Sequence, residues 1–205
     1  MKIKRLTFIV GENTSEINEY LYKLRSRNIF KNIITCRMAG DSFSTSLNWQ
    51  KINKSYKNNI DVLIDYIKNN LSSKDKYIII IDNIELFLSP TKQSEVIPKL
   101  LETFPDFDFV IATHSPYILT STNTLIEAHN TYLLHKDKEK KISKIVPKSL
   151  WLPFDQVQAF EIKDGRLIDI LDYETNLINA TVIDSVSDEI GTICDKLLEI
   201  KYPDI

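Results

Sequence analysis

Glycine is scarce in this sequence, with four residues among 205, whereas average usage of about 7% would give roughly fourteen. The four are Gly11, Gly40, Gly165 and Gly191. None precedes a lysine, and no pair has the spacing of the phosphate-binding loop G-x-x-x-x-G-K-[ST]. An intact loop of that kind is therefore excluded. A dinucleotide-binding fingerprint, which needs three closely spaced glycines, is excluded as well.

Cysteine and long apolar runs are also lacking. Cys36 and Cys194 are too few for a disulfide framework, and neither lies in a cluster with zinc-binding spacing. No window approaches the ~18 uninterrupted apolar residues of a membrane span. The apolar run Leu6–Val10 behind the basic N-terminus is too short for a secretion signal. These absences predict a cytoplasmic protein that does not act on a membrane.

Neither sign of charge dominates, since 26 basic residues face 28 acidic ones for a net charge of −2. Such a balance produces no field that would attract nucleic acid, so a nucleic-acid partner is not indicated by charge. With 43% hydrophobic residues the chain can bury an ordinary core. The length suits one large domain, or a core domain with a C-terminal extension.

The apolar pattern alternates between strands and helices. The run Tyr77–Asp82 is continuous and β-branched, which is typical of a parallel strand buried on both faces. Alternation of such strands with helices predicts an α/β fold with a mostly parallel sheet flanked by helices. Strands are expected at Leu6–Val10, Asn32–Met38, Tyr77–Asp82 and Phe107–Thr113, helices at Glu16–Arg25, Asn59–Leu71 and Gln93–Thr103, and a weakly patterned segment at Ala39–Lys57.

The pattern changes after Ser121, where the predicted elements become shorter. The segments Thr131–His135 and Ile142–Val146 flank the charged run Lys136–Lys141, which predicts a hairpin with a solvated tip. A second hairpin is expected over Ala159–Ile170, where Asp164 and Gly165 form a favoured turn pair. The segment Thr181–Ile200 is expected to form one long helix.

Two polar residues follow predicted buried strands, namely Asp82 and His114. The carboxyl ends of parallel strands meet at one edge of the sheet, where α/β folds bind ligands, so both side chains could converge on one crevice. A strand-end aspartate can equally cap a following helix, and His114 can cap the turn before Pro116. Spacing alone leaves both interpretations open.

The stretch IIIIDNIELFLSPTKQSEVIPKLLETFPDFDFVIATHSP resembles the second half of the ATP-binding-cassette and SMC-like ATPases of the bacterial AAA-domain group. Members read D-E-x-E-x-H-L-H-P and then T-H-S-P. The second motif is intact here as Thr113 to Pro116. The resemblance implies a P-loop NTPase-like core over residues 1–125 with its helical lobe largely missing, and a C-terminal extension of small β-hairpin and helix over 126–205, packed on that core. The first motif corresponds to Asp82, Asn83, Glu85, Leu86, Leu88 and Pro90.

The N-terminus is similar to the strand and G-E-N-G-S-G-K-S loop of the same family. The implied nucleotide-binding residues are Gly11, Glu12, Asn13, Ser15 and Asn18. Thr14 and Glu16 stand where the loop has glycines that approach phosphate closely, and Ile17 stands where it has the phosphate-binding lysine. Glu16 adds repulsion, since two unit charges ~4 Å apart repel by about 4 kcal/mol at an effective dielectric of 20. Ordinary ATP binding is therefore expected to be badly weakened.

The resemblance also assigns the hydrolytic residues. Asp82 is the expected Mg²⁺ partner and His114 the expected γ-phosphate sensor, whereas the acidic residue that orients the attacking water is replaced by Asn83, which cannot accept a proton. Glu85 is the remaining candidate base. The glycine-rich signature loop would fall at residues 55–59, where there is no glycine. ATP and Mg²⁺ are the implied cofactors, and the erosion of these motifs is equally compatible with none.

The resulting hypothesis is a degenerate ABC/AAA-type ATPase-like domain that does not hydrolyse ATP and acts as a binding or regulatory partner. Relatives work as nucleotide-gated dimers, often beside nucleases or toxins in phage defence or DNA maintenance. The implied partner is a second copy, an intact ATPase or such an effector. One alternative is an active ATP-binding ATPase with an unorthodox phosphate loop. Another is a metal-dependent nuclease using Asp169, Asp172 and Glu174, which a solvated loop also explains.

Overall fold

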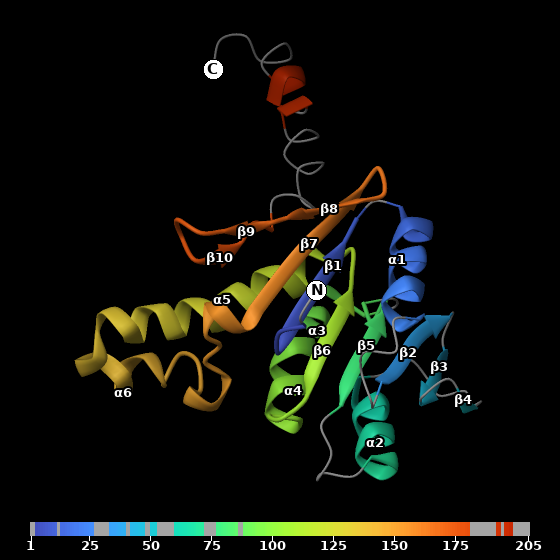
Figure 1. The fold of residues 1–205 in the computed structure, drawn as a ribbon. Helices are drawn as coiled ribbons and strands as arrows, with labels where there is room; N and C mark the ends of the chain where they lie inside the picture. The colour runs from blue at the N-terminus through green and yellow to red at the C-terminus, as the bar shows by residue number, and fades with distance from the viewer. Residues whose placement is uncertain are drawn as a thin grey trace.

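Five parallel strands form the centre of an eight-stranded sheet in the computed structural model (Figure 1). Their order in space is β2 (Ile33–Ala39), β5 (Ile78–Asp82), β6 (Asp108–Ala112), β1 (Leu6–Val10) and β7 (Val157–Lys163). Antiparallel strands complete both sides, with β3 (Ser42–Leu47) and β4 (Gln50–Ile52) beside β2, and β8 (Arg166–Asp169) beside β7. The structure describes residues 3–11, 13–26, 33–39, 42–47, 50–52, 60–71, 77–85, 88–180, 192–193 and 195–198.

The central strands are buried on both faces because helices cover both sides of the sheet. In β5, Ile79 and Ile81 point into one core cluster and Ile80 into the other. The first cluster lies under α2 (Ile60–Asn70), α4 (Val96–Thr103) and α5 (Pro116–Leu134), whereas the second lies under α1 (Thr14–Ser26). This arrangement confirms the predicted α/β fold, a mostly parallel sheet flanked by helices, which is consistent with a P-loop NTPase-like domain.

The helix predicted over Gln93–Thr103 is present as two pieces, α3 (Pro90–Ser94) and α4. Ser89 caps α3 with its side chain, and Pro90 occupies the first helical position, where a proline costs no hydrogen bond. Most of the other expected strands and helices match the observed elements within a few residues. The predicted signature loop at residues 55–59 and the loop residue Glu12 lie outside the described part of the chain.

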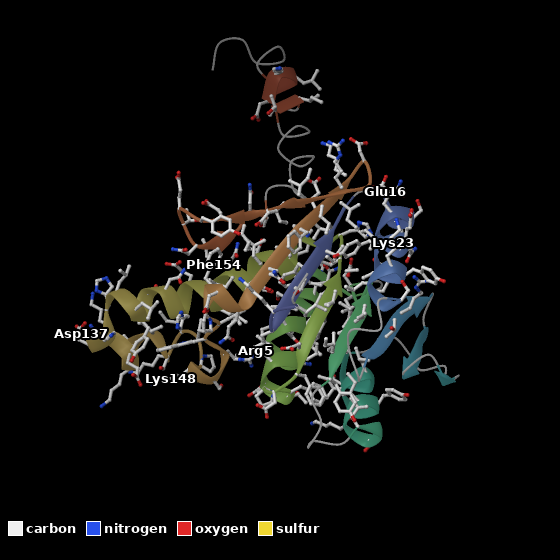
Figure 2. All side chains as sticks on the ribbon, viewed as in Figure 1. Arg5, Glu16, Lys23, Asp137, Lys148 and Phe154 are labelled. Atoms are coloured by element: carbon white, nitrogen blue, oxygen red, sulfur yellow. The ribbon has the colours of Figure 1, made fainter. Side chains whose placement is uncertain are left out.

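The first predicted hairpin is wrong. Residues Thr131–Leu134 belong to α5, and the charged run after them forms a 3-10 turn (Lys136–Lys138) and the short helix α6 (Glu139–Ile142). Leu125, Ala128 and Tyr132 lie on one face of α5 at helical spacing, and Tyr132 packs on Trp151 with ring centroids 5.0 Å apart. Packing of that helical face outweighs the β propensity of the local Thr-Tyr-Leu-Leu sequence. Asp137 and Lys148 mark this region in Figure 2.

The second predicted hairpin is confirmed as β7 and β8. Asp164 and Gly165 at its turn both have positive φ, at 52° and 70°, which suits a two-residue turn between twisted strands. The chain then forms the small antiparallel pair β9 (Leu171–Asp172) and β10 (Leu177–Ile178). Of the long helix predicted over Thr181–Ile200, only residues 192–193 and 195–198 are described, and these are helical.

Both predicted parts of the chain contribute strands to the same sheet. β1 and β6 belong to the first part and β7 to the second, and β1 lies between the other two. The predicted boundary at residue 125 falls inside α5, and the division into core and extension stays a prediction. Among the described residues, no helix has the length and apolar character needed to cross a bilayer.

Asn123 on α5 holds β10 through both ends of its amide. Its Nδ2 donates to the Ile178 carbonyl and its Oδ1 accepts from the Ile178 N–H, each at 2.8 Å. We expect Asn123→Ala to lower the free energy of unfolding by about 2 kcal/mol, because it leaves a buried backbone donor and acceptor unpaired. Urea unfolding measures this effect.

Asn130→Ala is the matched control for Asn123→Ala. Asn130 lies on the same helix and makes one longer hydrogen bond, 3.2 Å, to the Asn176 carbonyl. It should cost less than about 1 kcal/mol. Equal losses for the two variants would show that the amide bridge to Ile178 contributes nothing specific.

Candidate functional site

The carboxyl edge of the sheet brings together the residues that the sequence singled out. Asp82 ends β5 and lies in register with Ala112 of β6. Asn83 follows in the left-handed region, with φ at 57°, and its N–H donates to the Ala112 carbonyl. His114 lies two residues beyond Ala112. Asp82, Asn83 and His114 are therefore neighbours along one edge, as expected for parallel strands.

Asp82 is paired within the chain. Its side chain is 2% exposed, and its Oδ2 accepts a hydrogen bond of 2.7 Å from Nε of Arg37. Arg37 is the register partner of Asp82 on the neighbouring strand β2. The same guanidinium also donates to the side-chain oxygen of Asn18 on α1. Arg37 thus joins β2, β5 and α1 at one point.

Arg37 is not part of any motif in the sequence. The sequence does contain one signal, because Arg37 is a charged residue within the strand sequence IITCRMA, whose other side chains are uncharged. Arg37 and Asp82 each follow an apolar run, but their pairing depends on the register of two strands that lie far apart in sequence. Register of this kind is set by packing of the whole sheet and cannot be counted from the sequence.

A second network joins the loop after β5 to the loop after β6. Glu85 is 9% exposed, and its Oε1 accepts the His114 backbone N–H at 2.7 Å. Gln93 of α3 donates to the Leu88 carbonyl and accepts from the Ser115 hydroxyl at 2.6 Å. Ser115 caps α5 by accepting from the Ile118 N–H. The side-chain cap of this helix is therefore Ser115, and Glu85 fixes the backbone of His114.

The segment similar to a phosphate-binding loop is short and already hydrogen-bonded. Residues 11–13 alone connect β1 to α1, which begins at Thr14. Asn13 accepts from the Ser15 N–H with its side chain, at 2.9 Å, and from the Glu16 and Ile17 N–H groups with its carbonyl, at 3.1 and 3.2 Å. In a phosphate-binding loop such N–H groups point at the ligand.

Side chains around this segment serve the fold. A Cβ on Gly11 would lie 2.9 Å from the Ile162 carbonyl oxygen of β7, so the glycine is required by that strand's close approach. Glu16 faces the β7–β8 turn (Figure 2) and accepts from the Gly165 N–H at 3.4 Å. Ile17, at the position of the phosphate-binding lysine, is 1% exposed and belongs to the core under α1.

Comparison with known proteins gives partial matches, two of them to retron proteins. No model of a known protein family matches the chain. Over 67 residues, 33% of its length, the chain is 36% identical to the Retron Ec83 probable ATPase of Escherichia coli. Over 47 residues, 23% of its length, it is 43% identical to the Retron Vc95 probable ATPase of Vibrio cholerae serotype O1 biovar El Tor. Part of the chain is therefore similar to proteins named as retron probable ATPases. The matches span 12% and 9% of those proteins' own lengths.

An ATPase-like site raises the question of whether these residues fit Mg²⁺. Oδ1 of Asp82 is buried without a hydrogen-bond partner among the described residues, as an oxygen that binds a cation could be. The other oxygen, Oδ2, accepts a hydrogen bond from Arg37. Arg37 also donates to Asn18, which stands where a phosphate loop has its Mg²⁺-binding hydroxyl. Within the described ranges, no group of three or more His, Cys, Asp or Glu side chains could hold a metal. With Arg37 bound to both Asp82 and Asn18, the site as it stands does not fit the ion.

The late carboxylates close turns instead of converging. Asp169 accepts from the Leu171 N–H at 2.9 Å and from the Tyr173 hydroxyl at 2.7 Å. Asp172 accepts from the Glu174 and Thr175 N–H groups. These contacts are typical of exposed turns, which agrees with the solvated-loop interpretation of Asp169, Asp172 and Glu174.

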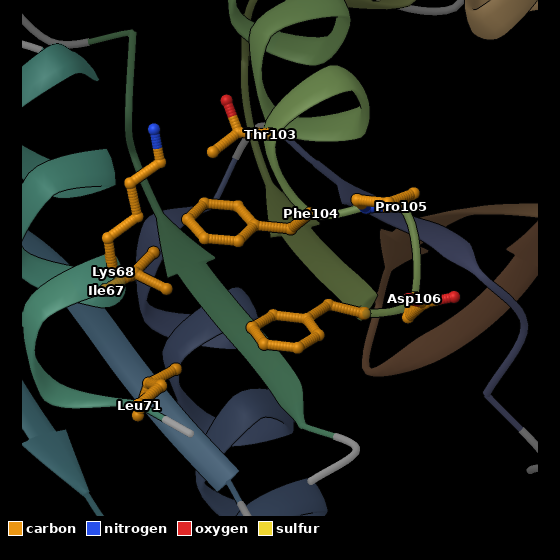
Figure 3. Close-up of a pocket in the computed structure, with 8 residues that line it drawn as sticks. Ile67, Lys68, Leu71, Thr103, Phe104, Pro105 and Asp106 are labelled. Atoms are coloured by element: carbon orange, nitrogen blue, oxygen red, sulfur yellow. The ribbon is translucent and has the colours of Figure 1, made fainter. Parts of the chain in front are cut away.

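Two cavities of the described part lie away from the carboxyl edge. One of about 200 Å³ lies at the amino edge of the sheet between α2 and the turn before β6 (Figure 3), beside the stacked rings of Phe104 and Phe107. The other, about 470 Å³, lies between α5 and the segment that includes Ile142 and Val146. Neither is lined by Asp82 or His114, so neither extends the candidate site.

Burial raises the pKa of Glu85 above its ordinary value, and the hydrogen bond from the His114 N–H opposes that shift only in part. The folded state therefore binds more protons at Glu85 than the unfolded state does, and stability falls as pH rises from about 4.3 through the raised pKa. In Glu85→Gln this loss is absent. We expect its stability relative to the unmodified protein to improve across that window, as measured by urea unfolding.

The control is Glu102→Gln on the exposed side of α4. Its stability difference from the unmodified protein should stay flat across the same pH window. If Glu85→Gln gave an equally flat difference, Glu85 would not be the buried group that titrates.

Because Ile17 packs in the core, the lysine of a phosphate loop cannot be restored there without damage. We expect Ile17→Lys to lower the free energy of unfolding by about 3 kcal/mol or more, since it places an unpaired charge in the apolar core. Tyr22→Lys, at a 66% exposed position of the same helix, should change it by less than about 1 kcal/mol. Equal stability of the two variants in urea unfolding would mean that residue 17 can turn outward.

Proposed function

We propose that this chain is a degenerate ABC/AAA-type ATPase-like domain that does not hydrolyse ATP and acts as a binding or regulatory partner. The observation that supports this most directly is the state of the loop segment. The N–H groups of Ser15, Glu16 and Ile17 are bound to Asn13, so they are not directed at a phosphate. A triphosphate could bind only after the first turn of α1 had unwound.

Other residues support the same proposal. Asn83 offers an amide in place of a water-orienting carboxylate, and its Oδ1 is buried without a partner among the described residues. Glu85 is engaged with the His114 backbone. Glu16 places a carboxylate beside the loop, where it would repel phosphate. Glu85 and Glu16 have structural contacts that a nucleotide would have to disturb.

The partner in this proposal is a second copy, an intact ATPase or a nuclease or toxin effector. Similarity to two proteins named as retron probable ATPases supports an ATPase-like domain with a role in defence. Since the matches cover a small fraction of those proteins, the activity and partners of the whole relatives are not transferred to this chain by identity alone.

The alternative is an active ATP-binding ATPase with an unorthodox phosphate loop. One observation favours it, because Asp82 and His114 do lie at the same edge and Oδ1 of Asp82 has no partner among the described residues. In that case Arg37 would have to release Asp82 before a magnesium-bound nucleotide could enter.

Calorimetric titration with ATP and Mg²⁺ separates the two. We expect no binding heat at millimolar ATP, either for the unmodified protein or for Asp82→Ala. Asp106→Ala, an exposed aspartate at the opposite edge, controls for nonspecific loss. Micromolar binding that disappears in Asp82→Ala and persists in Asp106→Ala would overturn the proposal and favour the alternative.

Sedimentation velocity gives a second readout for the same proposal. A domain that binds its partner without nucleotide should show the same sedimentation coefficient with and without magnesium ATP. A shift to a larger species on ATP addition would instead indicate a nucleotide-gated dimer, contrary to the proposal.

A further inference from the structure

We propose that Arg37 is the resident cation of this domain. Its guanidinium takes, from within the chain, the place between Asp82 and Asn18 that a divalent metal ion would take, so the carboxyl edge is assembled without metal. This goes beyond the proposed function, because it concerns how the edge is neutralised whether or not a nucleotide binds.

Arg37 lies where one side chain reaches both Asp82 and Asn18. Arg37 and Asp82 are register partners on adjacent parallel strands, and both lie on the face of the sheet that α1 covers. One guanidinium nitrogen lies 2.7 Å from Asp82, and a second contacts Asn18. A planar guanidinium can donate to two acceptors at once, so a single side chain links a strand and a helix as a metal ion would.

Arg37 balances the negative charge of Asp82. The Asp82 side chain is almost fully buried, whereas the Arg37 side chain is 44% exposed. A buried carboxylate without a counter-charge is strongly unfavourable, and an arginine partner neutralises it while its own outer face stays in water. A guanidinium keeps its positive charge in proteins, so this neutralisation needs no metal ion.

Arg37 also opposes the binding of a divalent ion to Asp82. A divalent ion on the free Oδ1 of Asp82 would lie next to the positive guanidinium and be repelled by it. No further acidic or histidine side chains gather into a ligand set in the part of the chain that is described. The carboxylate is thus available to a metal ion only if Arg37 is removed.

The test uses Mn²⁺ alone as the probe, with bound ion measured by electron paramagnetic resonance. The unmodified protein and Asp82→Asn should bind Mn²⁺ equally weakly, since Asp82 adds no site while Arg37 is present. Arg37→Met should bind at least ten times more tightly, and Arg37→Met/Asp82→Asn should lose that gain. Lys23→Met, which removes an exposed lysine from α1, should leave Mn²⁺ binding unchanged.

Thermal unfolding provides the matching readout. Arg37→Met should melt at a lower temperature, and both added Mn²⁺ and the second change Asp82→Asn should recover part of the loss. Arg37→Lys keeps the charge and should fold and exclude Mn²⁺, so the proposal remains testable if Arg37→Met does not fold. Loss of Mn²⁺ exclusion in Arg37→Lys would overturn it.

Two results would overturn the inference directly. One is tighter Mn²⁺ binding by the unmodified protein than by Asp82→Asn, and the other is an Arg37→Met variant that gains no binding. Failure of the proposed function looks different, because ATP binding in metal-free buffer would contradict that function and leave Arg37 as the resident cation.

Discussion

A carboxylate buried at the end of the central strand constrains this entire edge of the molecule. Asp82 is removed from water by the strands on either side and by α1, so its charge must be balanced by a group within reach. Arg37 can do so only if β2 and β5 pair in the observed register, and Asn18 can join only if α1 packs at its observed position. The placement of two strands and a helix is therefore tied to one ion pair.

The opposite side of the same edge is held by a second set of hydrogen bonds. Gln93 and Ser115 connect α3 to the start of α5, and Glu85 accepts a hydrogen bond from the His114 N–H, next to Ser115. Groups that an α/β domain commonly directs toward a ligand at the carboxyl edge are here directed toward one another. Each such contact fixes a loop at this edge, while Oδ1 of Asp82 and Oδ1 of Asn83 stay buried without a partner among the described residues.

Much of the fold was predictable because strong local signals agree with the final packing. The isoleucine run before Asp82 specifies a strand buried on both faces, and Asp164 with Gly165 specifies a two-residue turn. The end of α5 was not predictable from local pattern, because Tyr132 faces Trp151, a residue far along the chain. The sequence placed Asp82, Asn83 and His114 at one edge but could not supply Arg37, whose role exists only through strand register.

The order of strands also shapes how the chain can fold. β1 is made before its neighbours β6 and β7, which come from residues 108–112 and 157–163. During synthesis β1 therefore waits with both edges unpaired until most of the chain has left the ribosome, and closing such distant pairings is slow. A strand as apolar as Leu6–Val10, unpaired on both sides, is a template for aggregation. A chain truncated before β7 would leave one edge of β1 unpaired, and we expect such a fragment to aggregate more readily than the whole chain.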